Sequence, residues 1–123
     1  MLKLLFDEHI SPSVARGLRH NDASIVVHAM TEWQDGSLLG REDEFCLREA
    51  AAHKLTLATY DRRTIPPLLK SWTEQGRSHA GVIFVDDKTI APSNIGGLVS
   101  ALGSLARESK HWHWTGRVCF LQR

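Results

Sequence analysis

The apolar residues of this chain fall into two alternating patterns. Short, nearly continuous apolar runs predict strands within residues 2–6, 24–28, 55–59, 81–85 and 116–121. Apolar residues at helical spacing predict helices over about 12–19, 42–53, 66–76 and 93–106. This alternation predicts a doubly wound α/β domain, with a mostly parallel five-stranded sheet and helices on both faces. Because 123 residues can enclose one core, we expect residues 1–123 to form a single domain.

Two helix starts can be placed from capping residues. Ser11 precedes Pro12, and serine at the N-cap with proline in the first turn is a typical start. Ser93 is expected to cap the helix that contains Ile95 and Leu98 in the same way. Asp7 therefore lies where the first strand ends and a helix is about to begin.

Acidic residues recur at strand ends. Asp7 and Glu8 follow the first predicted strand, and Asp61 follows the third. Asp43 lies in the helix before the third strand, on the same face as the apolar residues at 46, 47 and 50. Because the carboxyl ends of parallel strands share one edge, Asp7, Asp43 and Asp61 are expected to converge. Mutually repelling carboxylates are suited to a hard cation, Mg²⁺ or Mn²⁺, with Glu8 as a further ligand.

A local interpretation of the same acids remains open. Each could cap a turn or form a nearby ion pair, Asp61 with Arg62 or Arg63 and Asp43 with the dipole of its own helix. The charge distribution favours the site mildly, since residues 1–61 carry a net −4 and residues 62–123 a net +5. An acidic half for metal and a basic half for a polyanion would suit a nuclease.

No apolar run approaches the roughly 18 residues of a membrane span, and the chain opens without a signal-peptide pattern. We therefore expect a cytoplasmic protein that does not associate with a membrane. Cys46 and Cys119 match no metal-ligand spacing and are expected to be reduced, buried thiols.

Three segments of the chain form a recognisable set: LLFDEHISP at 4–12, GRED at 40–43 and LATYDR at 57–62. Together they resemble the PIN-like family of small bacterial proteins related to PIN-domain toxin ribonucleases. The resemblance implies a PIN fold, a metal-dependent RNA-cleaving site and a small antitoxin protein as partner. By motif, Asp7, Asp43 and Asp61 match the family's acidic positions.

The chain departs from the family pattern at two positions. His9 stands where the family usually has Asn, and Arg63 replaces the second aspartate of the third motif. A guanidinium beside a dication site should weaken a second metal, and Glu8 or Asp86 could partly substitute for the lost acid.

Other residues have less specific roles. Arg16, Arg62 and Arg63 are candidate contacts for RNA phosphates, although each could equally lie on a solvated surface. The segment His111-Trp112-His113-Trp114 could form a zinc pair or a base-stacking platform. The simpler expectation is that both tryptophans cover the sheet or a homodimer contact, with the histidines outward.

The sequence thus predicts a Mg²⁺- or Mn²⁺-dependent endoribonuclease, the toxin of a toxin-antitoxin pair, that hydrolyses RNA with a metal-activated water. The alternative is a catalytically degenerate PIN-like protein that binds RNA or a protein partner. A phosphorelay receiver would also place acids after its first and third strands. It ranks lower, because a receiver needs a lysine at the end of the last strand and residues 117–120 contain none.

Overall fold

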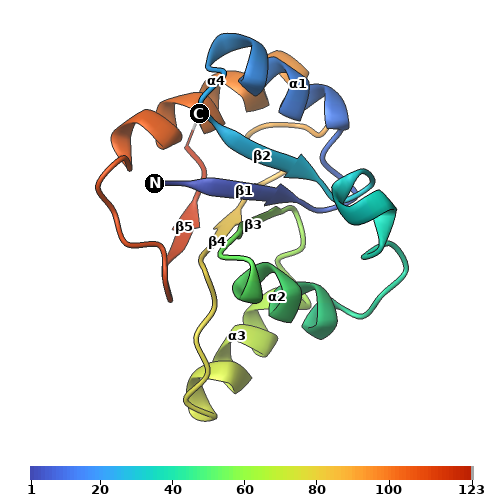
Figure 1. The fold of residues 1–123 in the computed structure, drawn as a ribbon, viewed down its shortest axis with the longest axis vertical. Helices are drawn as coiled ribbons and strands as arrows, with labels where there is room; N and C mark the ends of the chain where they lie inside the picture. Colours follow the sequence, from blue (N-terminus) through green and yellow to red (C-terminus); the bar gives the residue numbers. More distant parts are fainter. Residues whose placement is uncertain (123) are drawn as a thin grey trace.

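The computed structural model describes residues 1–122, which fold around one five-stranded sheet (Figure 1). The strands are β1 (Lys3–Phe6), β2 (Val26–Ala29), β3 (Thr56–Thr59), β4 (Val82–Phe84) and β5 (Val118–Phe120). They are arranged in the order β2-β1-β3-β4-β5, and every neighbouring pair is parallel. The predicted α/β architecture is confirmed, with a sheet that is wholly parallel where the sequence predicted mostly parallel.

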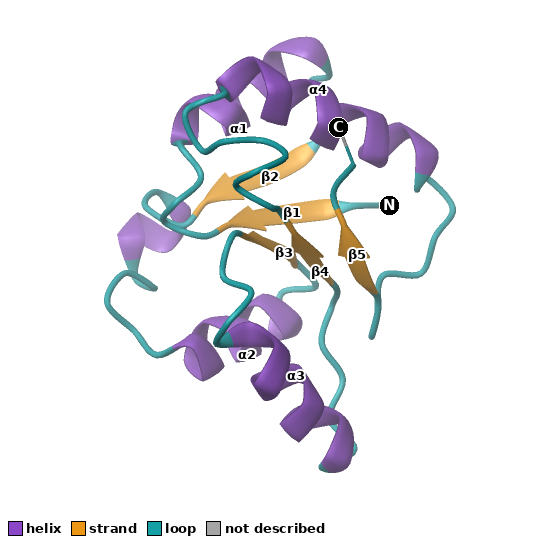
Figure 2. Ribbon diagram, turned by 180° about the vertical axis from the view of Figure 1, so that it is seen from behind, coloured by secondary structure: helices purple, strands orange, loops and turns teal. Residues whose placement is uncertain are grey.

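Helices cover both faces of this sheet. They are α1 (Pro12–Asn21), α2 (Asp43–Ala52), α3 (Ile65–Glu74) and α4 (Ile95–Glu108), with a short 3₁₀ turn, η1, over Trp33–Gly36. Figure 2 shows α1 and α4 on one side of the sheet and α2 and α3 on the other. The central strand β1 serves both cores: Leu4 and Phe6 pack under α1 and α4, and Leu5 packs under α2 and α3. All three side chains are 0% exposed, as the continuous apolar run predicts for a strand covered twice.

The capping prediction holds at α1 and is one residue off at α4. The Ser11 hydroxyl accepts a hydrogen bond from Ser13 N at 3.1 Å, and Pro12 occupies the first turn. At α4, however, Asn94 is the N-cap, and its Oδ1 accepts from Gly97 N at 2.9 Å. A Cβ at position 97 would lie 2.5 Å from the Asn94 amide nitrogen, so this cap depends on glycine at that position. Ser93 was therefore the wrong capping residue.

The segment before β5 also differs in detail from its prediction. β5 spans only Val118–Phe120, and Cys119 is partly rather than fully buried. Trp114 is buried and Trp112 half-buried, with ring centroids 5.6 Å apart, so both pack on the sheet as expected. Among residues 1–122, no helix has the length and apolar character needed to cross a membrane.

Gly81, which precedes β4, allows the Trp114 segment to approach the sheet closely. Its φ is +104°, and a Cβ there would lie 2.9 Å from Trp114 O. Gly81→Ala should therefore lower the free energy of unfolding by about 1–3 kcal/mol. Gly96→Ala is the matched control, because position 96 is helical and open, and it should raise stability by up to about 1 kcal/mol. Urea unfolding of both variants measures the difference; equal effects would contradict this packing account.

Candidate metal centre

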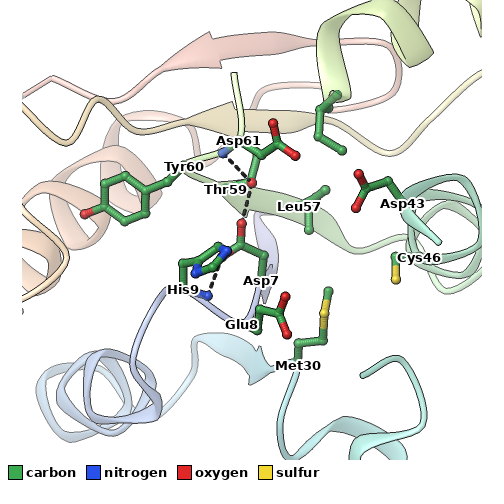
Figure 3. A pocket seen from close by; sticks show the side chains of 11 residues that line it. Asp7, Glu8, His9, Met30, Asp43, Cys46, Leu57, Thr59, Tyr60 and Asp61 are labelled. Atoms are coloured by element: carbon green, nitrogen blue, oxygen red, sulfur yellow. Dashed lines mark hydrogen bonds between the residues drawn. The ribbon is translucent and has the colours of Figure 1, made fainter. Parts of the chain in front are cut away.

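A cavity opens at the carboxyl end of the sheet, between β1 and β3. The chain passes from β1 to β2 on one side and continues from β3 to β5 on the other, so this pair forms the topological switch point of the sheet. The cavity has a volume of about 300 Å³. Four of the lining residues are acidic: Asp7, Glu8, Asp43 and Asp61. The structure thus brings the three predicted aspartates and Glu8 to one place (Figure 3).

Thr59, the last residue of β3, links two of these acids. Its side chain is 2% exposed, and its hydroxyl donates to Asp7 Oδ2 while accepting from Asp61 N at 2.9 Å. His9 N donates to the other oxygen, Asp7 Oδ1, at 2.9 Å. These two hydrogen bonds fix the orientation of the Asp7 carboxylate, and each of its oxygens keeps a further lone pair for a ligand.

Asp61 is held by the start of α3. Its Oδ1 accepts from Arg63 N at 3.0 Å and from Thr64 N at 2.8 Å, and the Thr64 side chain contributes a further hydrogen bond to the carboxylate. The alternative of an ion pair between Asp61 and a neighbouring arginine is not found among residues 1–122. Arg62 instead pairs with Asp86, with its Nη1 3.5 Å from Asp86 Oδ2. The local backbone turn accounts for this, because it directs the Asp61 carboxylate to main-chain N–H groups.

Asp43 differs from the other two aspartates. It is the first residue of α2, and Figure 3 shows its carboxylate facing that of Asp61 across the cavity. In the described part of the chain it has neither a hydrogen bond nor an ion pair. Of the three aspartates in the cavity, Asp43 is therefore the one whose charge has no hydrogen-bond or ion-pair partner.

The pKa directions follow from these surroundings. Burial raises the pKa of the Asp7 carboxyl, against the opposing effect of the hydrogen bonds from Thr59 and His9. Burial, and then repulsion from Asp61, Asp7 and Glu8, raises the pKa of Asp43. Burial also acts to raise the pKa of Asp61, but the backbone hydrogen bonds from Thr64 and Arg63 outweigh it and the net shift is downward. Two of the three aspartates are thus destabilised as anions.

The predicted arginines lie outside this cavity. Arg16, on α1, donates to Ser13 Oγ at 3.0 Å, and the Arg63 side chain is exposed. None of Arg16, Arg62 and Arg63 lines the cavity, and neither does Asp86. His9 does line it, a contact that its place two residues after Asp7 could have suggested.

The donor chemistry of the cavity fits a hard divalent cation, because its acidic ligands offer only carboxylate oxygens. Within residues 1–122, no three His, Cys, Asp or Glu side chains are already grouped closely enough to hold one ion together. Joint binding would require the carboxylates to turn toward one another. Of the three aspartates, Asp43 would break no hydrogen bond within residues 1–122 by turning.

Comparison with known proteins adds no relative: no family model matches this chain, and neither a curated protein nor a solved structure is significantly similar to it. The similarity of residues 4–12, 40–43 and 57–62 to PIN-like proteins stays a prediction. The function is therefore argued from the site itself.

Substitution of Asp43 should show whether its carboxylate destabilises the fold by repelling the neighbouring acids or stabilises it through a structural contact. A carboxyl whose pKa is raised above its unfolded value of 3.8 weakens folding above its folded pKa and has no effect well below 3.8. In EDTA at pH 7, Asp43→Asn should therefore raise the free energy of unfolding, by less than about 1 kcal/mol because solvent screens the charges. The gain should vanish near pH 3. Asp61→Asn should lower stability at pH 7, because its pKa shift is opposite. Loss of stability in Asp43→Asn would indicate a structural carboxylate.

Proposed function

We propose that this protein is a metal-dependent endoribonuclease of the PIN-like class. The observation that carries the proposal is the composition of the cavity at the β1/β3 switch point. Four carboxylates from three separate segments line it, and no Lys or Arg of residues 1–122 does. A protein that gathers negative charge in this way, without a cationic side chain, is suited to bind a divalent cation.

Each acid would have a distinct part in the metal site. Asp7 and Asp61 are pre-oriented by Thr59 and by the start of α3, while Asp43 can approach from α2. A bound Mg²⁺ or Mn²⁺ would supply Lewis-acid activation of water and neutralise charge on a phosphodiester. His9 lines the same cavity and offers an imidazole near the phosphate oxygens of a substrate.

RNA is the proposed substrate. Arg62 and Arg63 follow Asp61 directly and are exposed, so they are placed to contact phosphates that flank the scissile bond. The choice of RNA, the cytoplasmic location and a small antitoxin partner rest on the resemblance to PIN-like toxins. A homodimer is compatible with this proposal.

A non-catalytic binding protein is the second candidate, and two observations favour it. Both oxygens of Asp7 and one of Asp61 already accept hydrogen bonds, which leaves fewer lone pairs for metal. Arg63 also stands where the family pattern has a second aspartate.

The phosphorelay-receiver interpretation fits the strand order of the sheet. It ranks below the other two, because Leu121 and Gln122 follow β5 where a receiver requires lysine.

Removal of single carboxylates tests the nuclease proposal. Asp7→Asn, Asp43→Asn and Asp61→Asn should each reduce Mn²⁺-dependent cleavage of single-stranded RNA by at least about 100-fold, because each removes a proposed metal ligand. Glu74→Gln is the control, since Glu74 is exposed at the end of α3 and outside the cavity. Purified wild-type protein that leaves RNA intact at millimolar Mn²⁺ would favour the binding-protein alternative.

A further inference from the structure

A second cavity, of about 550 Å³, lies at the opposite, amino-terminal edge of the sheet. Its lining comes from the segments that lead into β1, β3, β4 and β5. The basic and aromatic side chains in this lining include Lys3, Lys54, His79, Trp112 and His113. Figures 1 and 2 both show the chain between α4 and β5 passing on the side of the sheet where β1 begins. No Asp or Glu lines this cavity, so its charge is opposite to that of the acidic one.

Two lysines line this cavity. Leu4 of β1 pairs with Thr56 of β3, so Lys3 precedes one of the paired residues directly and Lys54 precedes the other by two positions. Neither lysine has an ion pair in residues 1–122. Two ammonium groups that line one cavity repel each other, and an anion bound there would relieve the repulsion.

Lys54 also occupies a backbone conformation that usually favours glycine. Its φ is +58°, at the residue after the last turn of α2 where glycine is the common choice. A lysine at this position lowers the stability of the fold relative to glycine, and its ammonium group lies at the cavity. Strained positions of this kind tend to occur at functional sites.

His79 provides a buried donor. It is 7% exposed, and its Nδ1 accepts a hydrogen bond from Gly81 N at 3.0 Å. In the neutral ring the proton must then be on Nε2, and burial lowers the pKa of His79, which favours that neutral form. Nε2 has no partner among the described residues. A ligand oxygen in the cavity could accept from it.

Trp112 supplies an aromatic surface beside these donors. Its ring is half-buried, and the Arg117 guanidinium lies 4.5 Å from the ring centroid. Arg117 Nε donates to His113 O at 3.1 Å, which fixes the guanidinium against the indole. Indole rings and guanidinium planes both stack on nucleobases.

We infer that this cavity binds a nucleoside phosphate. Lys3, Lys54 and His79 Nε2 bind the phosphate oxygens, and the base lies against Trp112, whose ring Arg117 supports from outside the cavity lining. The volume is in the range of small-ligand sites, about 300–1,000 Å³. The same chemistry is offered by a free nucleotide and by the phosphorylated end of an oligonucleotide. The inference does not depend on nuclease activity at the acidic cavity.

The charge requirement can be tested by calorimetry with 5′-AMP in EDTA, where no divalent metal is available. The wild-type protein should bind with a Kd below about 1 mM, and Lys3→Gln and Lys54→Gly should each weaken binding at least about tenfold. Lys54→Gly should at the same time raise the melting temperature by roughly 2–4 °C, because glycine suits this φ. Lys70→Gln is the control, because Lys70 is exposed on α3 and lies outside the cavity. It should change neither the Kd nor the melting temperature.

The base requirement is tested by comparing ligands. Inorganic phosphate should bind at least about tenfold more weakly than 5′-AMP, and Trp112→Leu should weaken 5′-AMP but not phosphate. A 5′-phosphorylated tetranucleotide that binds tenfold more tightly than 5′-AMP would identify an oligonucleotide end as the ligand; equal affinity would identify the free nucleotide. Absence of 5′-AMP binding, binding unaffected by both lysine variants, or equal affinity for phosphate and 5′-AMP would overturn the inference.

Discussion

The parallel pairing of β1 with β3 is the contact on which the acidic cavity depends. The two strands are distant in the sequence, and the register of Leu5 with Leu57 brings Asp7 next to the end of β3. Asp7 N donates to Ala58 O at 3.1 Å, and the Thr59 hydroxyl donates to the Asp7 carboxylate. Because both strands are buried on two faces, this edge cannot shift without exposing the cores. The pair therefore acts as a rigid support for the acids.

Charge is distributed unevenly along the strand direction. Carboxylates gather at the carboxyl ends of the strands, and two lysines lie at the amino ends. Each cavity is electrostatically unfavourable without a ligand, since it gathers like charges that form no ion pair within residues 1–122. Such arrangements reduce stability and increase the free energy available from binding an ion of opposite charge. A cation at one edge and an anion at the other would each relieve this repulsion.

The sequence predicted the sheet well, because short apolar runs that are local in the sequence mark its strands. Leu4, Leu5 and Phe6 form a run that suits a strand covered on both faces, and the strand-end position of Asp7 followed from it. The cap of α4 was predicted one residue early. Ser93 and Asn94 are both good capping residues, and the close approach of the Asn94 side chain to Gly97, which favours Asn94, becomes visible only in the folded turn.

The details of the site were less predictable, because they depend on contacts between residues that are distant in the sequence. A threonine at the end of a strand is explained by β-propensity alone, so the link that Thr59 makes between Asp7 and Asp61 emerges only from the pairing of the strands. The partner of Arg62 is Asp86, which follows a different strand. The lysines of the second cavity are 51 residues apart in sequence and line the same cavity only because β1 and β3 are neighbours in the sheet.

The most direct test of the acidic cavity as a metal centre is a crystal structure of the wild-type protein grown with Mn²⁺, with an anomalous difference map. The account predicts a peak between β1 and β3, contacted by the carboxylates of Asp7, Asp43 and Asp61. Absence of any peak there at millimolar Mn²⁺, with the carboxylates remaining bound to Thr59 and the α3 backbone as described, would contradict it.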